Sequence, residues 1–220
     1  MTRPHLIIFD CDGVLVDSEP LANAVMKKYL TELGLSISLE RTMERFVGLS
    51  LASMRKTILS EDGLNLPDDF EEEVMHRDRL AFATDLKAIA GVSTTLDTLT
   101  LPRCVASSGD HSKIHNSLTL TGLLPYFDGS VYSAADVTNG KPAPDLFLHA
   151  AHNMNAGPQN SLVIEDSLAG VQAGVAAGMR VFGFVGGGHI TAGHADRLLD
   201  AGALLVFERM DDLAEQIAKL

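Results

Sequence analysis

The sequence has few cysteines, few basic residues and no long apolar segment. Its two cysteines, Cys11 and Cys104, are too sparse for a disulfide framework, which indicates a reducing cytoplasm. Its 17 basic and 29 acidic residues give a formal net charge of −12, which argues against nucleic acid and anionic membranes as partners. No apolar run approaches the ~20 residues of a membrane span. We therefore expect a globular cytoplasmic protein without a signal peptide.

The order of predicted helices and strands indicates an α/β fold with a helical insertion. Apolar strand-like runs alternate with helical patterns over most of the chain, which is typical of a doubly wound parallel sheet. Residues 17–86 differ, because four successive helices are expected there. We predict a Rossmann-like α/β core of residues 1–16 and 87–220, with a small all-helical domain of residues 17–86 inserted into it. The predicted strands span residues 6–9, 103–107, 130–133, 161–166, 181–185 and 204–207.

Acidic residues follow two of the predicted strands. Asp10 and Asp12 come after the first strand, and Glu165 and Asp166 end a later one. Open α/β sheets bind ligands at the carboxyl ends of their strands, and carboxylates clustered there need a cation or a proton to compensate them. Mg²⁺ prefers such oxygen ligands, so the pattern predicts a magnesium-dependent phosphoryl-transfer site. A calcium loop is disfavoured, because positions 14 and 21 carry Val and Leu instead of oxygen ligands.

Four motifs in order resemble one family of enzymes. Residues 9–19, Phe-Asp-Cys-Asp-Gly-Val-Leu-Val-Asp-Ser-Glu, resemble the first motif of the haloacid-dehalogenase superfamily, in its β-phosphoglucomutase-like and phosphogluconate-phosphatase-like branch. Ser107 in Val-Ala-Ser-Ser-Gly, Lys141 in Gly-Lys-Pro-Ala-Pro-Asp, and the pair Glu165-Asp166 match the later motifs. The resemblance covers the whole chain. It implies the fold expected above, with residues 17–86 as a helical cap that sets substrate specificity.

The resemblance implies a role for each of four catalytic residues. Asp10, expected to be ionised at neutral pH, is the nucleophile that forms an aspartyl-phosphate. Asp12 is the general acid and base, and its presence favours phosphate over halide chemistry, because a halide leaves without a proton. Ser107 holds a phosphoryl oxygen, although it could equally cap the next helix. Lys141 neutralises charge between nucleophile and phosphate, with a solvated turn as the alternative.

The remaining site residues bind metal or substrate. The expected magnesium ligands are Asp10, the backbone carbonyl of Asp12, and Asp166, with Glu165 binding directly or through water. The backbone N–H groups of residues 11–13 are expected to cradle phosphate, with Gly13 permitting the turn. The cysteine thiol between the two acids is better interpreted as a small buried apolar group than as a nucleophile. The expected substrate contacts are Cys11, Gly13, Ser108, Arg45 and Gly48, although an arginine at a helix end is often structural.

These residues predict a phosphatase that acts on a small metabolite. Sugar-phosphate members of the family carry Lys or Arg at positions matching 47, 50 or 51, where this chain has Val47, Ser50 and Leu51. The similar mutases carry His where it has Ala22. We expect a Mg²⁺-dependent phosphatase of a sugar, sugar-acid or polyol phosphate, present as a monomer or weak homodimer. A sugar-phosphate mutase and a non-catalytic binding protein are the alternatives.

Histidines and glycines carry weaker signals. The eight histidines include His189 and His194, and none stands at metal-ligand spacing from a cysteine or acid, so surface or packing roles are expected. Gly186–Gly188 predicts a flexible turn, and the role of residues 186–195 stays open. Glycines 170, 174 and 178 are expected to let a helix pack closely on the sheet.

Overall fold

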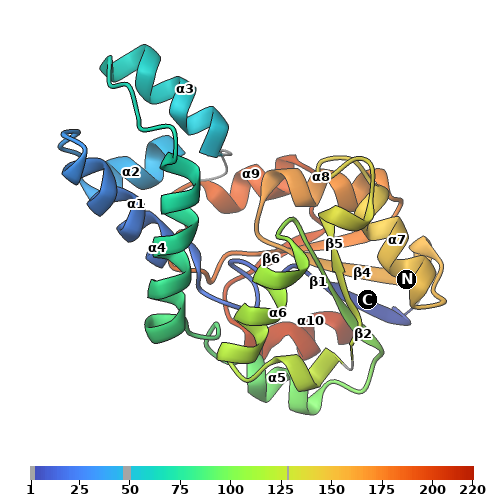
Figure 1. The fold of residues 1–220 in the computed structure, drawn as a ribbon. Helices are drawn as coiled ribbons and strands as arrows, with labels where there is room; N and C mark the ends of the chain where they lie inside the picture. The colour runs from blue at the N-terminus through green and yellow to red at the C-terminus, as the bar shows by residue number, and fades with distance from the viewer. Residues whose placement is uncertain (1–2, 47–50, 128) are drawn as a thin grey trace. The chain divides into compact units, whose positions relative to one another are not determined.

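The computed structural model describes residues 3–46, 51–127 and 129–220 (Figure 1). It contains two compact units, which we call the core unit (Met1–Asp17 and Lys87–Leu220) and the helical unit (Ser18–Leu86). Among the helices of the described residues, none is both long and apolar enough to cross a membrane.

The core unit is built on a six-stranded parallel sheet with the order β3-β2-β1-β4-β5-β6. The central strand β1 pairs on one side with β2 and on the other with β4, so that Ile8 stands opposite Cys104 and Val163. The chain order of the strands reverses at β1, which makes its carboxyl end the switch point where such sheets bind ligands. The strands are β1 (Leu6–Phe9), β2 (Arg103–Ser107), β3 (Val131–Ser133), β4 (Ser161–Glu165), β5 (Arg180–Phe184) and β6 (Leu205–Phe207).

Helices cover both faces of this sheet (Figure 1). One face carries α7 (Asp145–Asn153), α8 (Leu168–Ala176) and α9 (His194–Asp200), and the other carries α5 (Val92–Thr98), α6 (His111–Leu120) and α10 (Leu213–Ala218). Alternate strand residues such as Ile8 and Val163 pack with Phe147 and Val171 into one buried apolar cluster. Short 3₁₀ segments span Leu124–Phe127, Ala134–Asp136, Pro158–Asn160 and Met210–Asp212.

Two of the three glycines in and after α8 allow the close packing that the sequence predicted. A Cβ on Gly174 would lie 2.5 Å from Val181 Cγ2 on β5, and one on Gly170 would overlap Glu165 Oε1 at the end of β4. Gly178 differs, because nothing lies near its would-be Cβ. Its φ of +72° ends the helix in the left-handed conformation that glycine adopts at low cost.

The helical unit has its own apolar core. It consists of α1 (Glu19–Glu32), α2 (Leu39–Phe46), α3 (Leu51–Asp62) and α4 (Phe70–Asp85). Tyr29 of α1 stacks on Phe70 of α4 with ring centroids 5.6 Å apart, and the Arg77 guanidinium lies 4.1 Å from the Tyr29 ring. The buried members of this core are Met26, Tyr29, Leu30, Phe46, Ile58, Leu66, Phe70 and Val74.

Sequence patterns missed two short helices, α5 and α9. Helix α5 reads Val-Ser-Thr-Thr-Leu-Asp-Thr, and its four Ser and Thr residues have low helix propensity. It is held by tertiary contacts, since Val92, Thr95 and Leu96 are buried and the Thr95 hydroxyl donates to the Met210 carbonyl at 2.9 Å. Packing therefore outweighs propensity in this segment.

Candidate active site

The candidate site lies where three neighbouring parallel strands end. Asp10 follows β1, Ser107 ends β2, Glu165 ends β4, and Asp166 is the next residue. Because adjacent parallel strands present their carboxyl ends at the same edge, residues from distant parts of the chain meet there. Lys141 joins them from the segment between β3 and α7.

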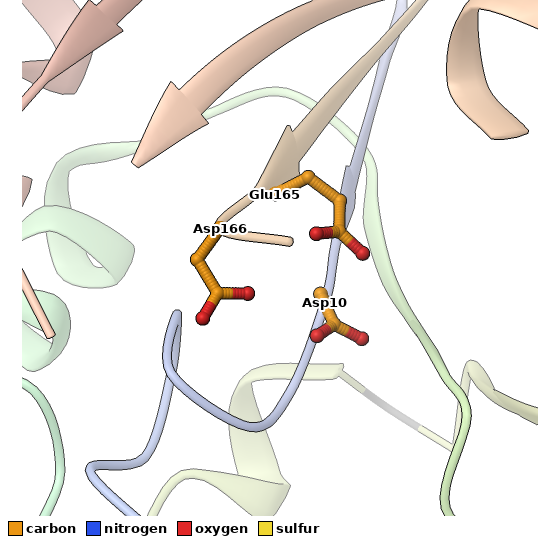
Figure 2. Close-up of side chains that lie close together, drawn as sticks. All are labelled: Asp10, Glu165 and Asp166. Atoms are coloured by element: carbon orange, nitrogen blue, oxygen red, sulfur yellow. The ribbon is translucent and has the colours of Figure 1, made fainter. Parts of the chain in front are cut away.

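Three buried carboxylates form the centre of the site. Asp10, Glu165 and Asp166 each offer an oxygen, and these oxygens all lie within 4.8 Å of one another. Figure 2 shows the three side chains side by side at the ends of β1 and β4. Carboxylates this close repel one another strongly where water is excluded, so the cluster needs positive charge or protons.

Lys141 supplies part of that charge. Its Nζ donates to Asp10 Oδ1 and Glu165 Oε1, each at 2.8 Å, and to the Ala106 carbonyl at 3.1 Å. Its side chain is only 4% exposed and lies over the Phe147 ring, 4.9 Å from the centroid. Burial by itself would lower the pKa of Lys141, but the Asp10 and Glu165 carboxylates outweigh it and the net shift is upward. Lys141 is therefore a permanent ammonium at neutral pH.

The chain by itself does not keep Asp10 ionised. Burial raises the pKa of Asp10 from its ordinary 3.8 to about 8; Lys141 opposes the rise, whereas Glu165 and Asp166 add to it. The expectation of an ionised Asp10 at neutral pH therefore needs correction, because it took the ordinary pKa of aspartate without the desolvation. Ionising all three acids would set three carboxylates against one ammonium and leave negative charge in excess, which a cation would offset, and hard oxygen donors fit Mg²⁺. The donor set thus suits the predicted cation.

Glu165 is held by protein donors on both of its oxygens. Oε1 accepts from Lys141, and Oε2 accepts from the Ser167 backbone N–H at 2.7 Å and its hydroxyl at 2.9 Å. The side chain is fully buried, and Gly170 leaves room for it. Ser167 also caps α8, since its hydroxyl accepts from the Gly170 N–H at 3.0 Å. The Glu165 carboxylate is thus fixed in place by the surrounding chain.

Asp12 lies at the more exposed side of the site and pairs with a lysine that the sequence did not single out. Lys113 Nζ on α6 donates to Asp12 Oδ2 at 2.8 Å. Helix α6 is capped by Asp110, whose side chain accepts from the Lys113 backbone N–H at 2.8 Å. Ser107 is therefore not the cap; its buried hydroxyl accepts from the Gly109 N–H at 3.3 Å.

A family model described as haloacid dehalogenase-like hydrolase matches residues 7–184. The chain belongs to this family. The curated 6-phosphogluconate phosphatase of Escherichia coli (strain K12) is 36% identical over 191 residues, which cover 86% of each chain. The predicted family resemblance is confirmed, and the chain is that of an enzyme.

Solved structures agree with the fold of this hydrolase. A haloacid dehalogenase-like protein of unknown function from Agrobacterium tumefaciens str. C58 is 43% identical with a TM-score of 0.91, covering 98% of both chains. A HAD family hydrolase from Deinococcus radiodurans R1, with bound phosphate and sodium, is 30% identical with a TM-score of 0.87. The match covers 100% of this chain and 97% of that one. The predicted fold class is confirmed.

The turn after β1 uses one of the donors that the sequence assigned to phosphate. The Gly13 N–H of the hydrolase donates to the Val16 carbonyl at 2.8 Å, so it closes the turn and does not point to a ligand. Gly13 has a φ of +78°, and a Cβ there would overlap Asp166 Oδ2. Cys11 is buried, and this burial raises the pKa of its thiol. The charges of Asp12 and Asp10 raise it further by smaller amounts. Cys11 thus stays a thiol, as the sequence predicted.

The other predicted substrate contacts stay predictions, and two of the five lie on different units of the chain or outside the described residues. Ser108 is exposed on the loop after β2. Arg45 belongs to the helical unit, where its guanidinium pairs with Asp62 at 2.6 Å and Glu61 at 2.9 Å and lies 4.9 Å from the Phe46 ring. These contacts pair the charge of Arg45 within that unit. They favour the structural role that the sequence analysis gave as the alternative to substrate contact. Gly48, Val47 and Ser50 fall outside the described residues.

Two histidines that were expected at the surface or in packing contact Asp166 instead. His189 Nε2 lies 2.9 Å from Asp166 Oδ2, and His194 Nε2 lies 2.6 Å from the Asp166 carbonyl oxygen. Both come from the segment after β5, whose carboxyl end shares the edge of the sheet with β1 and β4. That position was the signal available in the sequence, since histidines just after a core strand reach the site edge.

Two glycines of the predicted turn before His189 allow close approaches of the chain. A Cβ on Gly186 would overlap the Glu208 carbonyl oxygen, and one on Gly187 would lie 2.9 Å from His189 Cε1. The Gly188 N–H donates to Asp17 Oδ1 at 2.9 Å. This hydrogen bond therefore connects the loop after β5 to the loop after β1.

Proposed function

We propose that this hydrolase is a Mg²⁺-dependent phosphatase that acts on a small phosphorylated metabolite, a sugar, sugar-acid or polyol phosphate. The observation that carries the proposal is the buried group of Asp10, Glu165 and Asp166 with Lys141 against two of them. The matching phosphatase from Escherichia coli supports the substrate class. We also propose that residues 18–86 act as the cap that selects the substrate.

The residues would act in two steps. An Asp10 carboxylate oxygen forms a bond to phosphorus while the bond to the ester oxygen breaks, and Asp12 gives that oxygen its proton. Asp12 then takes a proton from water, whose oxygen attacks phosphorus and breaks the bond to Asp10. Inorganic phosphate leaves and Asp10 is restored. Ser107, at the end of β2, would hold a phosphoryl oxygen, and Lys141 would offset charge on Asp10.

Asp10, Asp166 and the Asp12 carbonyl would hold Mg²⁺. Both Glu165 oxygens already accept from the chain, which favours contact of Glu165 with the cation through water. When bound, the cation would supply the positive charge that lets an ionised Asp10 meet a phosphate dianion.

The test is phosphate release from a panel of sugar, sugar-acid and polyol phosphates, with Mg²⁺ and with excess chelator. We expect turnover only with Mg²⁺, and mass spectrometry of acid-quenched protein should find a phosphoryl group on the peptide that contains Asp10. The Asp10→Asn variant is the matched control and should show neither. Turnover in chelator after verified metal removal would contradict the metal assignment.

A second arm separates phosphatase from mutase. β-Glucose 1-phosphate is incubated with a trace of the 1,6-bisphosphate, and the products are followed by phosphorus NMR. Ala22 and Leu51 are apolar where similar mutases have His and Arg, so we expect free phosphate. Glucose 6-phosphate formed faster than free phosphate would establish the mutase instead.

A further inference from the structure

The loop after β5 and the first residue of α9 contact a single acid, Asp166, from two sides. His189 contacts its carboxylate and His194 contacts its backbone carbonyl, at 2.9 Å and 2.6 Å. The two imidazole rings stand edge to face with centroids 6.4 Å apart. One short segment therefore fixes both the side chain and the main chain of an acid in the proposed magnesium site.

The partners of these histidines assign the protons. An ionised carboxylate only accepts hydrogen bonds, so Nε2–H of His189 is the donor to Asp166 Oδ2. Arg197 lies 3.1 Å from His194 Nδ1 and can only donate, so that nitrogen accepts and the His194 proton sits on Nε2. Both rings thus donate through Nε2 to Asp166.

Two glycines from separate loops leave room for the His189 ring. A Cβ on Gly13 would lie 2.8 Å from His189 Cε1, and one on Gly187 would lie 2.9 Å from both Cε1 and Nδ1. A larger residue at position 187 would press on the ring, and one at position 13 would press on both the ring and the Asp166 carboxylate. The chain therefore accommodates an imidazole whose side chain is only 6% exposed, at the desolvation cost that burying a polar ring carries.

We propose that His189 is a positioning residue for Asp166, which holds Oδ2 by its Nε2–H so that the carboxylate is oriented to bind a divalent cation together with Asp10. The proposal rests on the magnesium site of the proposed function. Ligating carboxylates are commonly oriented by such outer hydrogen bonds, and loss of one typically costs ~10–100-fold in metal affinity.

Direct metal ligation by His189 fits the structure less well. Among the described residues, the atoms that converge as possible ligands come from Asp10, Glu165 and Asp166, and His189 stands outside this group. Mg²⁺ also prefers oxygen over nitrogen ligands. A purely apolar packing role is the other alternative, and the experiment separates it from positioning.

The experiment measures Mg²⁺ binding to the metal-free full chain by isothermal titration calorimetry, for the wild type, His189→Gln and His189→Met. Gln and Met have similar size, but only Gln keeps a donor that can reach Asp166. We expect Met to weaken Mg²⁺ binding ~10–100-fold and Gln to stay within about threefold of the wild type. His152→Met, at an exposed position on α7, is the control for an unspecific His-to-Met effect.

Thermal unfolding of the metal-free proteins completes the comparison. Equal losses of Mg²⁺ affinity in Gln and Met, matched by equal drops in melting temperature, would show packing and overturn the proposal. Unchanged affinity in Met would overturn it as well. If the wild type itself binds no Mg²⁺, the magnesium site of the proposed function fails, which is distinct from a failure confined to His189.

A second variant covers the case in which His189→Met does not fold. Gly187→Ala replaces no side chain of the site but puts a methyl group 2.9 Å from the His189 ring and 3.0 Å from the Gly13 carbonyl oxygen. We expect it to weaken Mg²⁺ binding in the same direction as His189→Met. Full affinity in folded Gly187→Ala, together with a displaced ring seen by NMR of the His189 imidazole, would contradict the proposal.

Discussion

The interior and the rim of the site use the same kind of ion pair in different surroundings. In the interior, Lys141 is 4% exposed and contacts Asp10 and Glu165, each at 2.8 Å. At the rim, Lys113 is 43% exposed and contacts Asp12, which is 18% exposed, at the same distance of 2.8 Å. The distances match, so the difference lies in the water around the charges.

That difference separates a fixed group from a movable one. A buried charge that loses its partner is stranded away from water, whereas an exposed pair gains ~0–1 kcal/mol and can open. The proposed nucleophile Asp10 is therefore held in place, while the proposed acid and base Asp12 can leave Lys113 to reach a substrate oxygen. The predictions below test this contrast.

The largest effect is expected from Lys141→Met. Removing the ammonium leaves Asp10 and the fully buried Glu165 without their shared cation, and breaking a buried pair typically costs ~3–5 kcal/mol. Denaturant unfolding of the metal-free variant should show this loss, and phosphatase activity should disappear. A loss below about 1 kcal/mol would mean that the interior pair behaves like a surface pair.

Asp12→Asn should act on catalysis and leave the fold intact. An alkoxide leaving group needs a proton, whereas p-nitrophenolate hardly does, and general acid catalysis typically supplies ~10²–10⁴-fold. In single-turnover experiments, the phosphorylation rate with a sugar phosphate should therefore fall far more than the rate with p-nitrophenyl phosphate. Equal losses for the two esters would remove Asp12 from the role of acid.

Without Mg²⁺, the buried Asp10 should make the free energy of unfolding fall as pH rises. Asp10 has a pKa of about 8 in the folded chain and an ordinary value of 3.8 when unfolded, so between these values the folded state binds more protons. The free energy of unfolding then decreases with pH, by at most about 1.4 kcal/mol per pH unit. Urea unfolding from pH 5 to 8 should show the decline, and Asp10→Asn should flatten it. An unchanged slope in that variant would point to another group.

Lys113→Met should have the smallest effect on stability. Its exposed pair with Asp12 is screened by water and salt, so the change in unfolding free energy is expected to stay within about 1 kcal/mol. The measurement is urea unfolding at low and high salt beside Lys141→Met. A loss as large as that of the interior variant would erase the contrast between rim and interior.

Local patterns were enough to find the main elements and the acids of the site. The run Leu6–Phe9 predicted β1 with its observed ends. The acids at the ends of this strand and of β4 were predicted to form one site, because open α/β sheets bind ligands at the carboxyl ends of their strands. Boundaries were less accurate: the strand predicted at residues 181–185 is β5, Arg180–Phe184, and the strand predicted at residues 204–207 is β6, Leu205–Phe207.

The amino-acid sequence by itself determined the strand-end acids, the family and the alternation that folds into a parallel sheet, because these depend on neighbouring residues and on period. Only the tertiary structure decided which side chains serve those acids. Lys113 carries no local signal, since a lysine on a helix has the same pattern wherever it points. The position of His189 and His194 after β5 predicts the edge of the sheet they reach but not the acid they contact. When the chain folds, Lys113, His189 and His194 acquire partners that lie 101, 23 and 28 residues away along the chain, respectively. Burial, which raises the pKa of Asp10, likewise exists only once that packing has formed.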